Sequence, residues 1–156
     1  MKVSLSVGDL PRVIAGFPGV GKSTLFRENP ERYADSDTST FDKAGFPANY
    51  IEHIKHLIET TDKTIFVSTH AAVRQALQEA VIPFALVYPD AELKPAYLER
   101  YVGRNSPQAF CDMMSEKFND FVRECDEFEY DRCTKFKLAE SDHNMRTAMQ
   151  ALGFDC

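Results

Sequence analysis

A glycine-rich segment near the start of the chain has the residue types that bind a phosphorylated nucleotide. The segment Gly16–Ser23 reads G-F-P-G-V-G-K-S and matches the pattern G-x-x-x-x-G-K-[ST]. Glycines let the backbone turn with its N–H groups inward, and these donors with the following helix N-terminus attract anions. The lysine can reach the β- and γ-phosphates, and the serine hydroxyl can ligate Mg²⁺. We therefore expect a site for ATP and Mg²⁺, with Ser23 as the metal ligand, formed by Gly16, Pro18, Gly19, Val20, Gly21, Lys22, Ser23 and Thr24.

Two carboxylates lie further along the chain, at the end of an expected strand. Asp35 ends the segment Tyr33–Asp35, and Asp37 follows it. A hydroxyl that accepts a phosphoryl group benefits from a carboxylate that takes its proton, whereas a phosphate acceptor needs only cations around it. Either aspartate could instead cap the following turn. The pair favours a hydroxyl acceptor and leaves a nucleotide phosphate open.

Cationic side chains later in the chain are candidates for contacting the phosphates. Lys94, Arg100 and Arg104 belong to this group, and a guanidinium binds phosphate oxygens through a bidentate fork. Arg100 and Arg104 share a face if one helix contains both, although Gly103 could end that helix. The alternative is a solvated helix flank.

Four further residues could contact the acceptor. A base ring could stack on Tyr50 and hydrogen-bond to Asn49, or these two could serve in core packing and helix capping. His70 follows an expected strand and could contact the acceptor or simply be exposed. Arg74 lies one helical turn later and could face either the reaction centre or the solvent.

Apolar runs alternate with segments of helical periodicity, which predicts strands separated by helices. Such βαβ units form a parallel sheet covered on both faces, and ligands bind beyond the carboxyl ends of its strands. The expected strands are Arg12–Ala15, a second strand with Tyr33–Asp35 as its tail, Thr64–Ser68, Phe84–Tyr88 and Thr134–Leu138. The expected helices are Lys22–Glu28, one that opens at Pro47, one that carries Val73, Ala76 and Leu77, and then Ala91–Tyr101, Ser106–Cys125 and His143–Leu152, the last with Ser141 or Asp142 as N-cap.

With its Walker A segment at Gly16–Thr24, the chain resembles the P-loop kinases, which include nucleoside monophosphate kinases and polynucleotide 5′-hydroxyl kinases. The stretches Asp35–Asp37, Phe46–Tyr50 and Leu86–Asp90 are also similar to small kinase-like proteins of phages. The resemblance implies a three-layer sandwich with a five-stranded parallel sheet. It also implies an acceptor region after the second strand and a mobile helical lid near Lys94–Arg104.

The resemblance assigns roles to some of the candidate residues. Polynucleotide-kinase-like enzymes take their base from the region after the second strand, which makes Asp35 the first candidate and Asp37 the second. Lid arginines of the family bind the donor phosphates, and adenine lies near the loop that corresponds to residues 139–144. Many P-loop enzymes have a metal-binding aspartate after the strand Thr64–Ser68, but this chain continues Ser68-Thr69-His70. An aspartate from the second strand is the substitute that we expect.

Composition limits the class of protein further. The chain has 156 residues, 44% of them hydrophobic, which fits one globular domain over residues 1–156. Its net charge of −6 argues against binding to DNA or membrane through bulk positive charge. Residues 1–10 lack a long apolar run, and the cysteines lack metal-ligand spacing, so we expect reduced thiols and a cytoplasmic protein, in the host cytoplasm if phage-encoded.

The sequence therefore favours an ATP-dependent kinase that acts on a nucleoside, nucleotide or nucleic-acid hydroxyl, with a hydroxymethylated pyrimidine of phage DNA as one specific acceptor. The alternatives are a nucleoside monophosphate kinase, a small-molecule kinase, and a non-kinase NTPase that acts on a partner protein. The missing aspartate near Ser68 and the absence of an N-K-x-D motif weigh against the NTPase. The oligomeric state does not follow from the sequence.

Overall fold

The computed structural model describes residues 11–36 and 44–154, and this part of the chain contains a five-stranded sheet. The strands are ordered β2-β3-β1-β4-β5, and every neighbouring pair is parallel. The predicted α/β class with five parallel strands is therefore confirmed. The bounds are β1 Val13–Gly16, β2 Tyr33–Asp35, β3 Thr64–Val67, β4 Phe84–Pro89 and β5 Cys133–Leu138.

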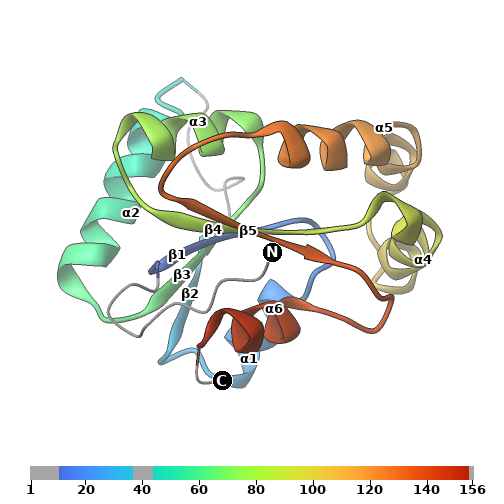
Figure 1. Cartoon of the computed structure of the whole chain (residues 1–156), viewed down its shortest axis with the longest axis horizontal. Coiled ribbons are helices and arrows are strands. Elements are labelled where there is room, and N and C mark those ends of the chain that lie inside the picture. The colour runs from blue at the N-terminus through green and yellow to red at the C-terminus, as the bar shows by residue number, and fades with distance from the viewer. Residues whose placement is uncertain (1–10, 37–43, 155–156) are drawn as a thin grey trace.

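Helices cover both faces of this sheet, which gives a three-layer arrangement (Figure 1). Helices α1 (Lys22–Glu28) and α6 (Met145–Leu152) pack together on one face. Helices α2 (Ala48–Thr60), α3 (Ala71–Glu79) and α5 (Gln108–Glu127) lie on the other. Helix α4 (Lys94–Gly103) lies beyond the end toward which β5 points, on the same side of the molecule as the carboxyl ends of the strands.

The burial of the strands explains why their sequences differ. β1 and β4 are buried along their whole lengths, because both faces of a parallel sheet are covered by helices. Their sequences are correspondingly continuous apolar runs. β5 occupies an edge and alternates between exposed and more buried positions, as its alternating sequence predicts.

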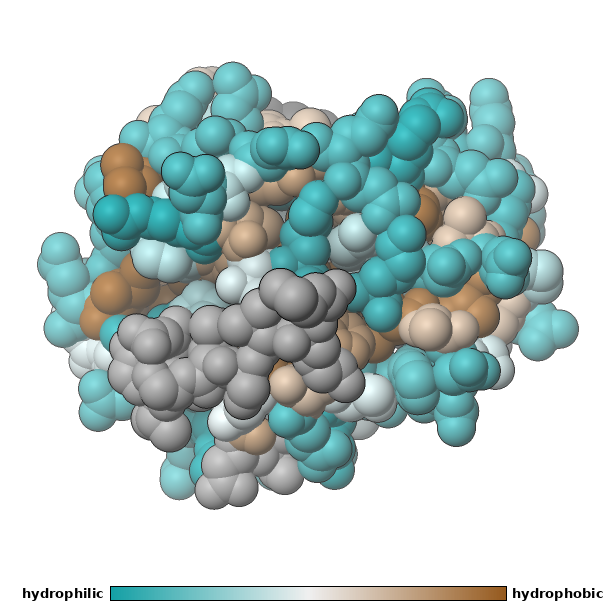
Figure 2. All heavy atoms as spheres, viewed as in Figure 1, coloured by the Kyte–Doolittle hydropathy of each residue, from teal (hydrophilic) through white to brown (hydrophobic). Residues whose placement is uncertain are grey.

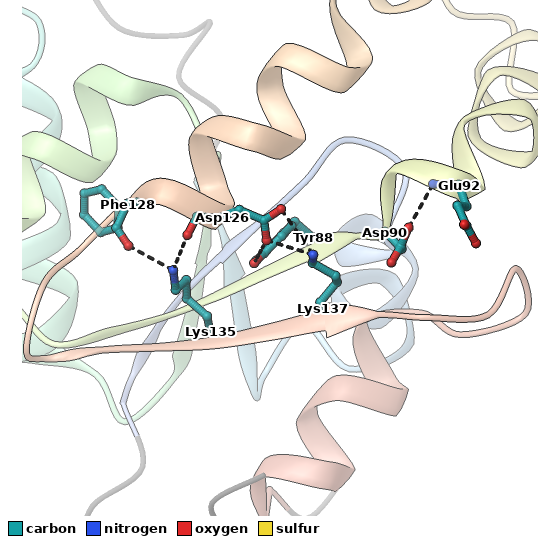
Figure 3. A network of polar contacts seen from close by, with 7 residues as sticks. All are labelled: Tyr88, Asp90, Glu92, Asp126, Phe128, Lys135 and Lys137. Atoms are coloured by element: carbon teal, nitrogen blue, oxygen red, sulfur yellow. Dashed lines mark hydrogen bonds and ion pairs between the residues drawn. The ribbon is translucent and has the colours of Figure 1, made fainter. Parts of the chain in front are cut away.

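A polar network joins the edge strand β5 to the end of α5 (Figure 3). The Asp126 carboxylate accepts a hydrogen bond of 2.6 Å from the Tyr88 hydroxyl and lies 2.9 Å from the Lys137 ammonium. Lys135 Nζ donates to the backbone carbonyls of Asp126, at 2.7 Å, and Phe128, at 3.0 Å. The last turn of α5 is thus fixed against both β4 and β5.

Two helix starts differ from the predictions. The expected helix Ala91–Tyr101 begins instead as a 3₁₀ turn, η3 (Ala91–Leu93), because Asp90 accepts from Glu92 N and starts a tighter turn. The prediction of Ser141 or Asp142 as the cap of the last helix is wrong. Asn144 caps α6 in a reciprocal pair with Thr147, and Gly153 ends it in the left-handed conformation.

The surface in Figure 2 is mostly hydrophilic, with hydrophobic residues in separate areas. Val81 and Val102 are the large hydrophobic side chains that are strongly exposed in the described part of the chain. None of the helices described for residues 11–36 and 44–154 is long and apolar enough to cross a membrane. Cys111, Cys125 and Cys133 are free thiols, and burial raises the pKa of both Cys125 and Cys133 to about 12.

Candidate functional site

The glycine-rich loop, defined here as Gly16–Gly21, connects the end of β1 to α1 at the carboxyl edge of the sheet. Gly19 has φ 91°, and Gly21 has φ 107° and forms the N-terminal cap of α1. A Cβ atom on Gly19 would lie 3.0 Å from Cε1 of Tyr101. Glycine at this position therefore permits both the left-handed backbone and the close approach of α4.

Backbone hydrogen bonds hold this loop in place from two sides. Phe17 N donates to the carbonyl of Val87 in β4 at 2.9 Å, and Met145 N, at the start of α6, donates to the carbonyl of Val20 at 2.6 Å. Lys22 Nζ folds back over the loop and donates to the carbonyl of Gly16. Within the described residues, no capping side chain occupies the backbone N–H groups at the N-terminus of α1.

A hydroxyl and a carboxylate meet where α1 faces the end of β2. Ser23 Oγ donates to Asp35 Oδ2 at 3.4 Å, and both residues are exposed. Oxygen ligands of these two kinds suit Mg²⁺, which commonly keeps several waters and binds substrate phosphates as well. The described residues contain no group of three or more histidine, cysteine or acidic side chains arranged for a metal. Ser23 and Asp35 are therefore the side chains that fit a Mg²⁺–phosphate group here.

A cavity of about 920 Å³ opens over the loop and reaches Asp35. Among the described residues that line it, four are lysine or arginine and one is acidic, although the whole chain has a net charge of −6. This local excess of positive charge suits a polyanionic ligand such as a triphosphate. The lining residues are Pro18, Gly19, Val20, Gly21, Lys22, Ser23, Thr24, Arg27, Asp35, Ser36, Ser68, His70, Arg100, Gly103, Arg104 and Phe110.

Helix α4, which was expected to be part of a mobile lid, packs into the core through Tyr97 and Tyr101, both fully buried. The Tyr101 hydroxyl donates to the carbonyl of Pro18 at 2.7 Å. Arg100 Nη1 donates to the carbonyl of Gly19 at 3.0 Å, and its Nη2 donates to the carbonyl of Ser141. The helix thus supports the glycine-rich loop and ties it to the loop before α6.

The two arginines of this region both line the cavity, but they differ in what they contact. Arg100 stacks over the Tyr97 ring at 4.3 Å and uses its guanidinium on backbone carbonyls. Arg104 follows the last residue of α4, is exposed, and lies 5.2 Å from the centre of the Tyr101 ring. Arg104 is therefore the better placed of the two to meet a ligand. Lys94 does not line the cavity.

His70 lies at the cavity wall, at the position before α3. Surrounding protein atoms partly desolvate its ring although it remains exposed to the cavity. This burial, followed by the positive charges of Lys22 and Arg74, lowers the pKa of His70 below its ordinary value. A neutral imidazole at pH 7 can accept as well as donate a hydrogen bond.

The other predicted acceptor residues lie away from the cavity. Tyr50 is fully buried and donates from its hydroxyl to the carbonyl of Ser36 at 2.8 Å, so it packs in the core and offers no face for a base. Asn49 Oδ1 accepts from Tyr50 N at 2.8 Å, and Pro47 occupies the N-cap position of α2. Tyr50 therefore has the core-packing role that was predicted as its alternative, whereas Pro47 and not Asn49 is the N-cap residue of α2, and neither Tyr50 nor Asn49 lines the cavity.

Arg74 faces neither the reaction centre nor the solvent, because it is only 6% exposed and paired within the protein. It donates to the carbonyl of Thr69 at 2.9 Å and to the Glu124 carboxylate at 3.1 Å. Its guanidinium also lies over the ring of Phe128 at 5.0 Å. A long-range partner on α5 thus turns this side chain into the core. Asp37 lies outside the described residues.

Sequence reasoning missed several residues that line the cavity. Ser36 and Ser68 directly follow β2 and β3, so the rule that ligands bind beyond the carboxyl ends of strands could have indicated them. Arg27 is four residues after Ser23 and shares its helix face. Phe110 lies in the first turn of α5, and no motif or spacing in the sequence indicated a role in the site.

In comparisons with known proteins, no protein-family model matches the chain, and no curated protein matches it either. The fold and the cavity are therefore the basis for any statement about function.

Proposed function

We propose that this chain is an ATP-dependent phosphotransferase that moves the γ-phosphoryl group to a hydroxyl of a nucleoside, nucleotide or nucleic acid. One observation carries this proposal: Ser23 Oγ lies 3.4 Å from the Asp35 carboxylate in a cavity that also contains the glycine-rich loop. The first residue belongs to the motif that binds Mg²⁺ and phosphates. The second ends β2 and is exposed to the cavity. A residue of the proposed phosphate-donor site and the proposed base are therefore in direct contact.

The donor side of the proposal rests on the loop and its cations. Backbone N–H groups of Gly19, Gly21 and the start of α1 would hold the phosphates, and Lys22 would exchange the Gly16 carbonyl for the β- and γ-phosphate oxygens. Ser23 would hold Mg²⁺ together with the phosphates and water, and the metal would neutralise the charge that develops during transfer. The cationic surplus of the cavity supports a triphosphate ligand on an otherwise acidic protein.

The acceptor side of the proposal rests on Asp35. The acceptor oxygen forms a bond to the γ-phosphorus while the bond from this phosphorus to the β–γ bridging oxygen breaks. Asp35 takes the proton of the acceptor hydroxyl, and ADP is the leaving group. Arg104, which is exposed at the cavity, would bind a phosphate of the acceptor or of the donor.

A nucleoside monophosphate kinase is the second candidate, and the cations of the cavity favour it. Arg27 and Arg104 line the same space as Lys22 and could bind an acceptor phosphate that needs no base. Asp35 would then serve the metal alone. The two candidates differ in whether loss of the Asp35 carboxylate affects nucleotide binding or the chemical step.

Label transfer from γ-labelled ATP with Mg²⁺ tests the proposal directly. The acceptor panel contains nucleosides, nucleoside monophosphates, 5′-hydroxyl oligonucleotides, and DNA with hydroxymethylated pyrimidines, and Lys22→Ala is the control. We expect label on a hydroxyl with the wild-type chain and none with the variant. Label on a phosphate supports the second candidate. Slow hydrolysis of ATP with every acceptor unlabelled contradicts both kinases and supports an NTPase that acts on a partner protein.

A further inference from the structure

The hydroxyl of Ser68 is buried at the wall of the cavity, and none of the described residues forms a hydrogen bond with it. Within residues 11–36 and 44–154, two buried side-chain polar atoms lack such a partner, Ser68 Oγ and Tyr97 Oη. Tyr97 belongs to α4 and does not line the cavity, whereas Ser68 does. A buried hydroxyl without a partner costs about 1–3 kcal/mol, so its presence at a binding surface needs an explanation.

The strand register places Ser68 between the two chemical halves of the cavity. Ala15 of β1 pairs with Val67 of β3, so the next residues on the two strands are Gly16 and Ser68. On the other side, Ser36 N donates to the carbonyl of Phe66 at 3.0 Å, which sets the end of β2 beside β3. Ser68 therefore lies with the glycine-rich loop on one side and the Asp35–Ser36 segment on the other.

The charges around Ser68 indicate which group its hydroxyl meets. Lys22 is hydrogen-bonded to Gly16, the neighbour of Ser68 across the sheet, and its charge also acts on His70 two residues later. Donor phosphates that replace the Gly16 carbonyl as the hydrogen-bond partner of Lys22 would therefore lie beside Ser68. A phosphate oxygen accepts from a serine hydroxyl, and a hydrogen bond to a charged acceptor is stronger than a neutral one.

We propose that Ser68 Oγ donates a hydrogen bond to the γ-phosphoryl group of the bound nucleotide and positions that group between Lys22 and Asp35. This inference rests on the proposed function and adds a residue to its phosphate site. Ser68 occupies the end of the strand next to the loop. Its hydroxyl can donate to a phosphate oxygen without binding the metal itself.

Calorimetric titration of the full chain with two Mg²⁺-bound ligands tests the proposal. The ligands are a non-hydrolysable ATP analogue with an imido β–γ bridge, which has the γ-phosphoryl group, and ADP, which lacks it. We expect Ser68→Ala to weaken binding of the ATP analogue about tenfold, as for loss of one hydrogen bond to a charged group, and to change ADP binding less than twofold. Ser115→Ala, which removes an exposed hydroxyl of α5, is the matched control and should change neither.

The unliganded protein supplies a second readout. Because Ser68 Oγ has no described partner, Ser68→Ala should leave the Tm unchanged or raise it. A Tm lowered by several degrees would mean that the hydroxyl has a structural partner and would overturn the proposal. Unchanged affinity for the ATP analogue also overturns it, as does an equal loss for ADP. If the wild-type chain binds neither nucleotide, the proposed function itself fails, whereas binding that is lost in Lys22→Ala but kept in Ser68→Ala refutes Ser68 alone.

Discussion

The two ends of the cavity are built in different ways. The loop end is held by backbone hydrogen bonds to β4 and α6 and by the Tyr101 and Arg100 side chains of α4. The Asp35 end sits on the three-residue strand β2. There Ser36 contacts α2 through two side chains: its carbonyl accepts from Tyr50, and its Oγ lies 3.2 Å from His53 Nε2. The loop end is held by backbone bonds to β4 and α6, whereas the Asp35 end, among the described residues, has backbone pairing with β3 alone and relies otherwise on side chains of α2.

We infer from this difference that the proposed nucleotide binding and the proposed chemical step depend on different ends of the cavity. A rigid loop gives donors fixed in space, which is the arrangement that stabilises phosphate charge at little reorganisation cost. A shorter, side-chain-supported strand end can change its acceptor contacts without disturbing that loop. Substitutions at the loop end should therefore affect nucleotide binding, and those at the Asp35 end should affect turnover and acceptor choice.

The largest expected effect comes from Lys22→Ala at the loop end. It removes the ammonium group from the phosphate site, and we expect kcat/KM for label transfer to fall by about 10³-fold, near the upper range for loss of one electrostatic contact. Nucleotide affinity, measured by calorimetry, should fall as well. Lys117→Ala, an exposed lysine of α5, is the control. Near-normal turnover by Lys22→Ala would remove the loop from the proposed mechanism.

Asp35→Asn should give the next largest effect on label transfer and tests the different role of the Asp35 end of the cavity. Loss of a general base lowers kcat by about 10²-fold, with affinity for Mg²⁺–ATP changed less than threefold. Steady-state kinetics and calorimetry separate the two quantities. Asp62→Asn, before β3 at the opposite end of the sheet, is the control.

The outcome of this substitution also separates the remaining assignments. A loss of affinity together with kcat would make Asp35 a metal ligand and favour a phosphate acceptor. If Asp37→Asn alone lowers kcat, the base is Asp37, and the comparison between the two ends still holds. Unchanged kcat in both variants would contradict a carboxylate base altogether.

Tyr101→Phe tests whether α4 supports the loop. Removing the hydroxyl leaves the Pro18 carbonyl without its donor, so we expect about 1 kcal/mol less stability in urea unfolding and a KM for ATP raised a few-fold. Tyr130→Phe is a matched control, because the Tyr130 hydroxyl also donates to a backbone carbonyl, that of Ile82 at 3.2 Å. It should lose comparable stability with KM unchanged. Equal KM values for the two variants would mean that α4 has no special link to the site.

The smallest effect is expected for Asp126→Asn, in the network of Figure 3. Burial alone would raise the pKa of Asp126, but hydrogen bonds from Tyr88 and Lys137 and the positive charges of the two lysines lower it overall. A carboxyl with a lowered folded-state pKa stabilises the fold above its unfolded-state pKa, and this contribution is lost as pH falls through the folded-state pKa.

Because the Asp126 side chain is 40% exposed, solvent screening limits this stabilisation to about 1 kcal/mol or less. Asp126→Asn should therefore unfold slightly more easily at pH 7. Its deficit relative to the wild type should shrink as pH falls below the ordinary pKa of 3.8 and vanish once pH is below the lowered folded-state pKa, which urea unfolding at several pH values measures. Label transfer should be unchanged. A change in kcat would link this edge of the sheet to the site.

Local patterns let the sequence determine the fold and the loop end of the cavity. Gly16–Ser23 is a contiguous motif that can be recognised from the sequence alone. A short apolar run such as Thr64–Val67 predicts a buried strand from its own residues. The helix α1 was predicted with the bounds that the structure has, and Tyr33–Asp35, predicted as the tail of the second strand, is the whole of β2. Asp35 could also be predicted, since the end of a parallel strand is where ligands bind.

Tertiary structure alone decided which side chains face the cavity. Tyr50 and Arg74 were turned into the core by partners far along the chain, Ser36 and Glu124. Ser68 became a candidate because its hydroxyl is buried without a partner, which no sequence pattern records. Helix α4 became a support because Gly19 admits Tyr101 so closely. Each of these outcomes depends on the packing of residues distant in sequence, whereas periodicity and motifs describe only neighbours along the chain.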